Sequence, residues 1–572
     1  MSIGERSFDV IIVGAGAAGC VLAARLSEQA DRQVLLLEAG ADAAPGEEHP
    51  HIRDPFPVLD SNPRFLWPDL NVKLEADGAA GPGRCIPYIQ GRGVGGSSNV
   101  NGMAADRGLP EDYEEWRRAG ASGWGWREVL PYFCKLEHDL DFAGSLHGRE
   151  GPIPVRRVVP EQWAPFSAAV AGALQRRGFE RLRDFNADFR DGVGAAPMNC
   201  LPEQRISASM AYLTREVRRR TNLTLVANAL AERIDIGGGR AGGVVVRTAD
   251  GTRTFRGREI IVACGALQSP ALLMRSGLGP AASLAALGIK ITRDLPGVGR
   301  NLQNHFMVGL PTHLPSSSMQ PASQRPWLQG LLRYSSQCAG CSAHDMLLIA
   351  FNRVAWHPLG RHVGALLVEL HKPYSRGTVE LARADPGATP RVCFNLLADP
   401  RDLKRLVGGL RLLLDVMGDR EVMRARNEVF LPNGAMVARL SQRGAWNWWQ
   451  AWAIARLFDL APLRKRLLGA AAVDVAALAR DEERLRQLVR LGAAPVYHVC
   501  GTCRMGSADS QGSVVDPGCR VIGIEGLRVV DASVFPTIPS GGLHLPVMMT
   551  AEKMAEQIKA EWRERDVPKR EP

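Results

Sequence analysis

The sequence has no run of apolar residues long enough to cross a bilayer, which takes about 20 residues. Its first residues lead directly into a strand pattern, without the charged and apolar segments of a secretory signal. Internal repeats and low-complexity tracts are missing as well. We therefore expect a cytoplasmic protein with no transmembrane segment, folded over nearly all of its length and ending in a charged tail at 566–572.

Charge of one sign is nowhere collected into a block. The formal net charge is +10, but the 70 Lys and Arg are spread among 60 Asp and Glu. The densest basic cluster, Arg218 to Arg220, follows a predicted helix, and a solvated helix end accounts for it. This pattern argues against nucleic acid as a partner. Attraction to anionic substrates or membrane surfaces stays open as a weaker alternative.

The cysteines do not have the pattern of a secreted disulfide framework. Their number is odd, 11, and several, such as Cys264, stand in apolar surroundings typical of reduced, buried thiols. Two C-x-x-C pairs, Cys338/Cys341 and Cys500/Cys503, could together bind zinc. The pairs are far apart in sequence and the second belongs to a motif described below, so we expect no metal site. The first reads as a loop whose thiols could oxidise.

A length of 572 residues exceeds the size at which one hydrophobic core stops growing, which predicts two lobes. Residues 8–37 have the pattern of a β-α-β unit, with strands at 8–13 and 33–37 and a helix at 17–26. Short apolar runs at 258–263 and 527–530 predict further strands of the same lobe.

The composition changes between about 306 and 491, where Trp, Arg and Leu are frequent. Within it, 403–417 has the spacing of an amphipathic helix. We expect this part of the chain to form the second lobe.

The motif GAGAAG at 14–19 follows the first predicted strand and opens the first helix. Gly14 permits a tight turn, Gly16 lets the backbone approach a pyrophosphate, and Gly19 lets helix and strand pack closely. Glu38 closes the second strand, where an acid can accept hydrogen bonds from ribose hydroxyls. The motif predicts a dinucleotide site, and FAD and NAD both use it.

Several longer motifs decide between these cofactors, because with them the sequence closely resembles the glucose-methanol-choline (GMC) oxidoreductases. The main ones are GRGVGGSSNVNG at 91–102, GALQSP at 265–270 with SGLG at 276–279, HVCGTCRMG at 498–506 and VDAS at 530–533. Additional matches are LPGVGRNL at 295–302 and SRGTV at 375–379. The resemblance covers nearly the whole chain apart from about 316–343 and 444–473.

The resemblance implies an α/β protein of two lobes, a Rossmann-like FAD-binding domain and a substrate domain built on an antiparallel sheet with helices. We expect the FAD-binding domain at 1–155, 200–310 and 492–565, and the substrate domain at 156–199 and 311–491. The residues expected to contact FAD are Gly14, Gly16, Ala17, Ala18, Gly19, Glu38, Ala39, Trp67, Arg92, Val94, Gly96, Ser97, Asn101, Gly102, Met103, Ala104, Ala231, Asp531, Ala532 and Val547.

The same resemblance implies the chemistry, the oxidation of an alcohol with hydride transfer to flavin N5. His498 occupies the family's catalytic position, and a neutral imidazole near pH 7 suits a general base. His544 occupies the partner position, where many bacterial dehydrogenases of the family carry Asn. His305 is expected to be structural. Some members attach FAD covalently through a histidine at the position of Val100, so we expect non-covalent FAD here.

Two alternatives share this fold, a lyase of the hydroxynitrile-lyase type and a flavin photoenzyme that decarboxylates fatty acids. The sequence leaves open the identity of the alcohol, the oligomeric state, and whether O2 or another acceptor reoxidises the flavin. Four tryptophans at 446–452 could line an apolar pocket, although near-helical spacing more often indicates packing.

Overall fold

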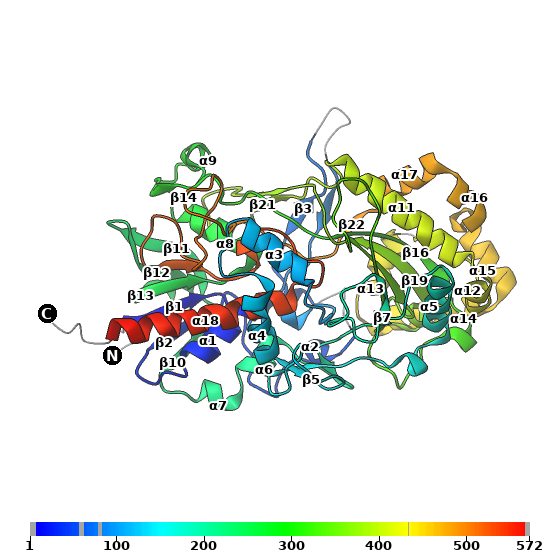
Figure 1. Ribbon diagram of the computed structural model, residues 1–572, viewed down its shortest axis with the longest axis horizontal. Helices are drawn as coiled ribbons and strands as arrows, with labels where there is room; N and C mark the ends of the chain where they lie inside the picture. The colour runs from blue at the N-terminus through cyan, green and yellow to red at the C-terminus, as the bar shows by residue number, and fades with distance from the viewer. Residues whose placement is uncertain (1–6, 57–61, 78–82, 433, 567–572) are drawn as a thin grey trace.

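The computed structural model describes residues 7–56, 62–77, 83–432 and 434–566. Two large sheets lie toward opposite ends of the long axis of the molecule (Figure 1). The expected tail at 566–572 falls outside the described residues except for Asp566. Among the residues described, no helix combines the length and apolar character that crossing a membrane requires.

The first lobe is built on a seven-stranded sheet, and its central strands are parallel. In order these strands are β10 (Leu223–Val226), β2 (Val34–Leu37), β1 (Ser7–Val13), β13 (Gly251–Val262), β12 (Arg240–Thr248) and β11 (Leu230–Gly237), with β23 (Leu527–Val529) beside β13. Helices α1 (Ala17–Leu26) and α18 (His544–Asp566) run side by side along it (Figure 1). The predicted β-α-β unit is confirmed.

Strand β13 begins seven residues before the predicted start at 258. Its first half, Gly251 to Arg256, pairs with β12 in an antiparallel hairpin. Five of these six residues are exposed or only partly buried and four are Thr or Arg, so an apolar run does not mark this half. Only the second half is buried between β1 and β23, where a parallel strand reads as continuously apolar.

The second lobe is built on a six-stranded antiparallel sheet, as the family resemblance implied. In order its strands are β22 (Ala494–Pro495), β16 (Phe306–His313), β19 (Val363–Leu370), β18 (Met346–Phe351), β17 (Leu328–Tyr334) and β7 (Gly192–Ala195). Helix α11 (Pro400–Met417) packs on β19 and confirms the predicted amphipathic helix. The side chain of Asp399 caps its start by accepting from the backbone N–H of Arg401.

A smaller sheet connects early and late segments of the chain. Its order is β20 (Thr378–Glu380), β21 (Arg391–Cys393), β3 (Asn71–Lys73) and β4 (Cys85–Pro87). The principal remaining helices are α3 (Pro110–Arg118), α4 (Trp126–Leu136), α5 (Pro165–Arg176), α8 (Gly265–Arg275), α12 (Arg420–Ala425), α13 (Gly434–Ser441), α14 (Ala445–Asp459), α15 (Ala461–Leu468), α16 (Val475–Arg480) and α17 (Glu482–Gly492). Each large sheet has its own apolar core, which gives the two lobes expected for this length.

An ion-pair network lies inside the second lobe. Arg405 of α11 is fully buried and its guanidinium lies 3.0 Å from Asp345 and 2.6 Å from Asp402. Burying two carboxylates is costly unless a cation pairs with them. The network therefore ties α11 to the turn before β18.

Replacing Arg405 by Ala should lower the free energy of unfolding by about 3–5 kcal/mol, because two buried carboxylates lose their counter-ion. Arg411→Ala on the same helix is the matched control, since Arg411 is half exposed and pairs with the exposed Glu482. The control should cost about 0–1 kcal/mol. Denaturant unfolding measures both variants, and equal losses would contradict the role given to Arg405.

Candidate active site

A cavity of about 560 Å³ is lined by residues of both lobes. One part of its wall comes from the loops after β1 and β2 and from the 91–102 segment, and the opposite part from β17, β18 and β19. His498 and His544 both line it. Nearly all residues expected to contact FAD also line it, and the exceptions are Gly19, Arg92 and Val94.

The glycines of the first motif shape a backbone cradle in this wall. Gly14 has a φ of +102°, which favours glycine. A Cβ built on Gly16 meets nothing within 4 Å, so the cradle is open there. A Cβ on Gly19 would overlap the carbonyl oxygen of Gly14, which explains why Gly19 serves packing rather than the cavity wall. The open edge at Gly16 fits a diphosphate that approaches the backbone at the start of α1.

Glu38 lies at the centre of the loops around the cradle. Its carboxylate accepts hydrogen bonds from the backbone N–H of Ala15 at 2.9 Å, Gly40 at 2.8 Å and Gly93 at 3.0 Å. The side chain also lines the cavity, where the sequence predicted a contact to ribose. The carboxylate thus orders three loops in addition to facing the cofactor side of the cavity.

Arg92 and Val94, two of the three predicted FAD contacts that do not line the cavity, make contacts just behind its wall. The guanidinium of Arg92 donates to the carbonyl oxygen of Ala39 at 3.0 Å and lies over the ring of Trp67 at 5.2 Å. The backbone N–H of Val94 donates to the carbonyl of Ala41. Arg92 therefore positions two wall residues, Ala39 and Trp67, and Val94 holds the loop that follows Ala39.

Asp531 holds the start of α8 against the cavity. Its carboxylate accepts from the backbone N–H of Gly265 at 2.8 Å and from the hydroxyl of Ser269 at 2.6 Å. Burial raises the pKa of Asp531. Among the α8 residues, Gly265, Ala266 and Gln268 line the cavity and were missing from the predicted contacts, although their motif had been recognised.

His498 follows β22 and is held by contacts on both its backbone and its ring. Its backbone N–H donates to Oδ1 of Asn304 at 2.7 Å, and its Nδ1 lies 2.9 Å from Nδ1 of His305. Burial, reinforced by the neighbouring His305, lowers the pKa of His498 to about 3. The imidazole is therefore neutral near pH 7.

The proton positions of this pair follow from a backbone contact of His305. Nε2 of His305 lies 3.0 Å from the carbonyl oxygen of Pro539. A carbonyl only accepts, so Nε2 carries the proton. Burial lowers the pKa of His305, which leaves Nδ1 of this neutral ring as an acceptor. Nδ1 of His498 must then donate, and Nε2 of His498 keeps a free lone pair.

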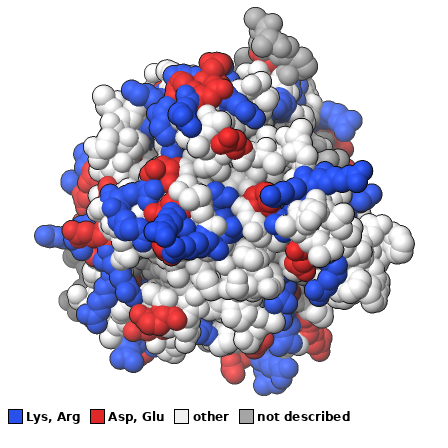
Figure 2. All heavy atoms as spheres, turned by 90° about the vertical axis from the view of Figure 1, so that its right-hand side faces the viewer, with Lys and Arg blue, Asp and Glu red and all other residues white. Residues whose placement is uncertain are grey.

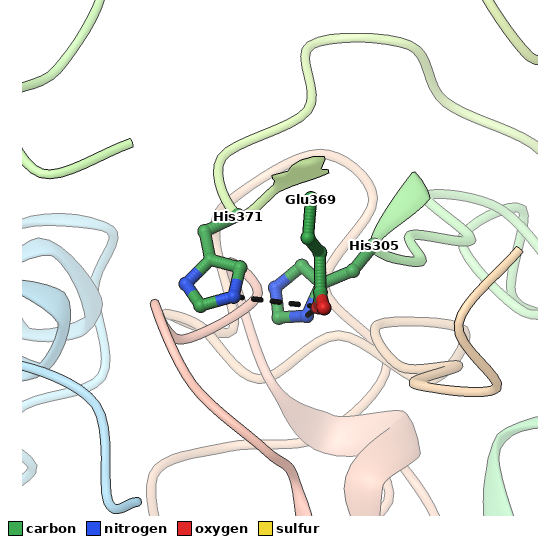
Figure 3. A group of neighbouring side chains, drawn as sticks. All are labelled: His305, Glu369 and His371. Atoms are coloured by element: carbon green, nitrogen blue, oxygen red, sulfur yellow. Dashed lines mark ion pairs between the residues drawn. The ribbon is translucent and has the colours of Figure 1, made fainter. Parts of the chain in front are cut away.

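Glu369 and His371 complete the surroundings of this pair (Figure 3). Oε1 of Glu369 lies 3.3 Å from Nε2 of His371, 3.3 Å from Nδ1 of His305 and 3.7 Å from Nδ1 of His498. Burial opposes charge on His371, but the Glu369 carboxylate outweighs it and raises the pKa of His371. In return, and against the effect of burial, His371 holds the pKa of Glu369 well below its usual range. The sequence predicted a structural role for His305, and the structure places its ring in contact with that of His498.

His544 is the first residue of α18 and approaches the cavity from a different element. Its Nε2 is buried and has no hydrogen-bond partner among the residues that the structure describes. Burial, with a contribution from Arg205, lowers the pKa of His544 to about 4. A buried imidazole nitrogen without a partner is suited to a ligand that supplies one.

The wall opposite the cradle is mainly apolar. Its large side chains come from the second sheet and from segments that pack on it, and they are Phe56, Trp327, Leu331, Leu347, Ile349, Phe351 and Leu367. None of these was predicted from the sequence. The four tryptophans at 446–452 are absent from the lining residues, and all four are exposed, so neither the pocket nor the packing interpretation of them holds.

The cysteine pairs do not form a common site. Cys500 and Cys503 are buried, whereas Cys338 and Cys341 are partly exposed in the loop between β17 and β18. In the part of the chain that the structure describes, the residue groups with metal-binding spacing contain no cysteine. The backbone N–H of Cys341 donates to the carbonyl of Cys338, which closes a turn.

The two glycines of the cradle give a matched pair of variants. Gly16→Ala should leave the unfolding temperature of the apoprotein unchanged but sharply lower FAD content, because its Cβ projects into open space at the cradle. Gly19→Ala should destabilise the apoprotein itself, because its Cβ overlaps backbone. Flavin absorbance and thermal unfolding of apoprotein separate the two effects. Full FAD occupancy in Gly16→Ala would contradict the cradle.

The chain resembles known proteins over nearly its whole length. Two family models described as GMC oxidoreductase match residues 8–307 and 373–551. A 5-(hydroxymethyl)furfural oxidase from Methylovorus sp. (strain MP688) is 38% identical, covering 97% of this chain and 99% of the relative. An oxygen-dependent choline dehydrogenase from Sinorhizobium medicae (strain WSM419) is 32% identical, covering 96% of this chain and 95% of the relative.

Solved structures agree with these relatives. A pyridoxine 4-oxidase from Mesorbium loti has a TM-score of 0.81 at 27% identity, covering 97% of this chain and 99% of that one. A formate oxidase variant from Aspergillus oryzae RIB40 has a TM-score of 0.82 at 24% identity over 98% and 99% of the two chains, and shows the shared fold. These relatives are oxidases and a dehydrogenase, which favours oxidation over the lyase and photoenzyme alternatives. Since the family models together cover more than half of the sequence, the chain belongs to the GMC oxidoreductase family and is an FAD-dependent enzyme that oxidises alcohols.

Proposed function

We propose that this protein oxidises primary alcohols attached to an aromatic or heteroaromatic ring, with His498 as the general base. The observation that carries the proposal is the pair of contacts that joins the carbonyl of Pro539 to His305 and His305 to His498 in the cavity wall. From these contacts we infer that Nε2 of His498 carries no proton. A base must offer such a lone pair to the hydroxyl proton.

FAD supplies the hydride acceptor when it is bound. We propose that Gly14, Gly16 and Ala17 at the start of α1 receive its diphosphate, and that Glu38 faces its ribose. Val100 lines the cavity where some family members have an attaching histidine, and valine has no nucleophile. We therefore propose that FAD is held without a covalent bond. We also propose an FAD-binding domain made of residues 1–155, 200–310 and 492–565. The substrate-binding domain is made of residues 156–199 and 311–491.

In this proposal, Nε2 of His498 takes the hydroxyl proton while the neighbouring carbon loses hydride. The resulting imidazolium is stabilised because Nδ1–H of His498 lies 3.7 Å from the Glu369 carboxylate. Glu369 can do this only while it is ionised, and the paired His371 keeps it so. Glu369, His371 and His305 are then positioning residues that act through His498.

We propose that His544 orients the alcohol oxygen. Its Nε2 lacks a partner within the described part of the chain, and His544 lines the same cavity as His498, so a substrate oxygen could complete its hydrogen bonding. The two neutral imidazoles then have different roles, one accepting the proton and the other holding the oxygen that loses it.

The substrate class follows from the wall opposite the cradle. Trp327 and Phe351 stack at 4.8 Å between ring centroids and line the cavity with Leu331 and Leu367. An aromatic ring fits such a surface. The names of two relatives, 5-(hydroxymethyl)furfural oxidase and pyridoxine 4-oxidase, also denote alcohols on aromatic heterocycles. Choline is less suited, because the charge of Glu369 is already paired with His371.

The test is turnover under air with 5-(hydroxymethyl)furfural, benzyl alcohol and choline, following O2 consumption. We propose O2 as the acceptor, so that each alcohol oxidised to aldehyde reduces one O2 to H2O2. The aromatic alcohols should have kcat/KM values at least about tenfold above choline. A preference for choline would contradict the proposed substrate class. Flavin reduction without O2 consumption would contradict O2 as the acceptor.

His498→Ala should slow flavin reduction by an aromatic alcohol on the order of 10²–10⁴-fold, the usual contribution of a general base, with FAD still bound. His544→Ala should lose as much or less if it orients the oxygen. The exposed His138 provides a control, since its replacement by Ala removes a histidine that does not line the cavity. Rapid anaerobic mixing measures the step directly. Wild-type rates in His498→Ala would refute the base, and a much larger loss at His544 would exchange the two roles.

On the acid side, kcat/KM should fall with a midpoint pH below the ordinary histidine pKa of about 6.5. The pKa of His498 is lowered, so its neutral, proton-accepting form persists as pH falls and is lost only when pH passes through the lowered value of about 3. The same sign holds for His544 with a pKa of about 4. Anaerobic flavin reduction across this range locates the limb. A midpoint at or above the ordinary value would show that the base is another group.

A further inference from the structure

Helices α14 and α15 of the second lobe carry large apolar side chains on the side that faces solvent. The inward side of α14 is made of Ala451, Ala455 and Phe458, which are buried in a small separate core. Its outward side has Trp446 at 74% exposed, Trp449 at 57% and Trp452 at 40%. A surface helix ordinarily turns its apolar face inward, so this one is inverted.

The exposed apolar surface continues along the next helix. Leu460, Leu463 and Leu467 are each exposed, with Leu467 at 56%. They lie within 446–467 together with Trp446, Trp449 and Trp452, and we call these six exposed side chains the Trp/Leu patch. Single exposed apolar residues are normal on a protein, but a gathering of this size marks an interaction site.

Basic side chains accompany the Trp/Leu patch. Arg456 lies over the ring of Trp452 at 5.7 Å, and Lys465 and Arg466 are exposed on α15. Figure 2 faces the end of the molecule where α14 and α15 lie, and shows Lys and Arg flanking broad uncharged areas. Between 434 and 470 the exposed basic residues are Arg439, Arg456, Lys465 and Arg466, against one acidic residue, Asp459, which pairs with Arg456. Arg464 is buried beside Glu428 and does not add to this surface charge.

The positive charge around the Trp/Leu patch indicates which kind of partner covers it. If a second copy of the chain covered the Trp/Leu patch symmetrically, two surfaces with the same excess of positive charge would meet, which opposes association. An anionic lipid surface complements the charge instead, since each Lys or Arg near it is attracted. Tryptophan is also the side chain that prefers the boundary between lipid headgroups and acyl chains.

We propose that the Trp/Leu patch docks this enzyme on the surface of a bilayer that contains anionic phospholipid. In the bound state α14 and α15 lie in the plane of the interface with Trp446, Trp449 and Trp452 among the headgroups, and Lys465 and Arg466 contact lipid phosphates. Neither helix crosses the membrane in this arrangement, because α14 has 15 residues and α15 has 8, fewer than the about 20 that a crossing takes.

Co-sedimentation of the FAD-loaded, full-length protein with vesicles tests this. The probes are vesicles of phosphatidylcholine alone and of phosphatidylcholine with phosphatidylglycerol, at low and high salt. The protein should sediment with the anionic vesicles, and salt should weaken binding because the basic residues contribute. The triple variant Trp446→Ser/Trp449→Ser/Trp452→Ser should lower the partition coefficient by roughly 100-fold. Lys465→Glu/Arg466→Glu should lower it on anionic vesicles.

The control is Leu140→Ser/Val159→Ser, which removes exposed apolar side chains elsewhere, 47% and 43% exposed, and should bind as the wild type does. Flavin content and turnover of a soluble alcohol should be unchanged in all variants, which shows that they fold. Absence of binding to anionic vesicles at low salt would overturn the proposal, as would wild-type binding by the triple variant. A concentration-dependent dimer in gel filtration that the triple variant abolishes would assign the patch to a second copy instead.

Discussion

The carboxylate of Glu38 is the contact on which the cofactor side of this molecule depends. It accepts backbone N–H groups from three loops that lie far apart in sequence, at Ala15, Gly40 and Gly93. These loops approach so closely that a Cβ on Gly40 would lie 2.5 Å from the backbone nitrogen of Gly93. A buried carboxylate would be costly without partners, and charge-assisted hydrogen bonds offset that cost. The position at the end of β2 therefore carries an acid for the loops as well as for ribose.

The part of the cavity around His498 depends on a chain of hydrogen-bond contacts between buried groups. The carbonyl of Pro539 orients His305, and His305 orients His498. His371 pairs with Glu369 and keeps its carboxylate ionised. The ring of His371 also stacks on that of His305, with 4.7 Å between the ring centroids. The residues come from the start of β16, from β19 and its end, and from the segment after β22. Pairing of β22 and β19 with β16 is what brings them together.

The sequence predicted the local parts of this arrangement well. The strand, turn, helix and strand at 8–37 are defined by apolar period and glycine, and the structure confirms them. Glu369, His371 and Trp327 could not be found in this way, because their approach to the cavity follows from strand pairing between distant segments. The contact between the rings of His305 and His498 could not be found either, for the same reason. Tryptophans at 446–452 were expected to face inward because most apolar helical positions do, and here alanine occupies the inward side.

The late position of several cavity residues affects the order of events during synthesis. β23 joins the first sheet beside Ile260 to Val262 of β13, and His498, Asp531 and His544 all belong to the last part of the chain. When synthesis has passed β13 but not yet reached β23, the edge of β13 at Ile260 to Val262 has no neighbouring strand. At that point the cavity also has only part of its wall. The flavin compartment can therefore close only after translation reaches α18. Until β23 has been made, the edge of β13 that it covers is a surface that a chaperone or another nascent chain can contact.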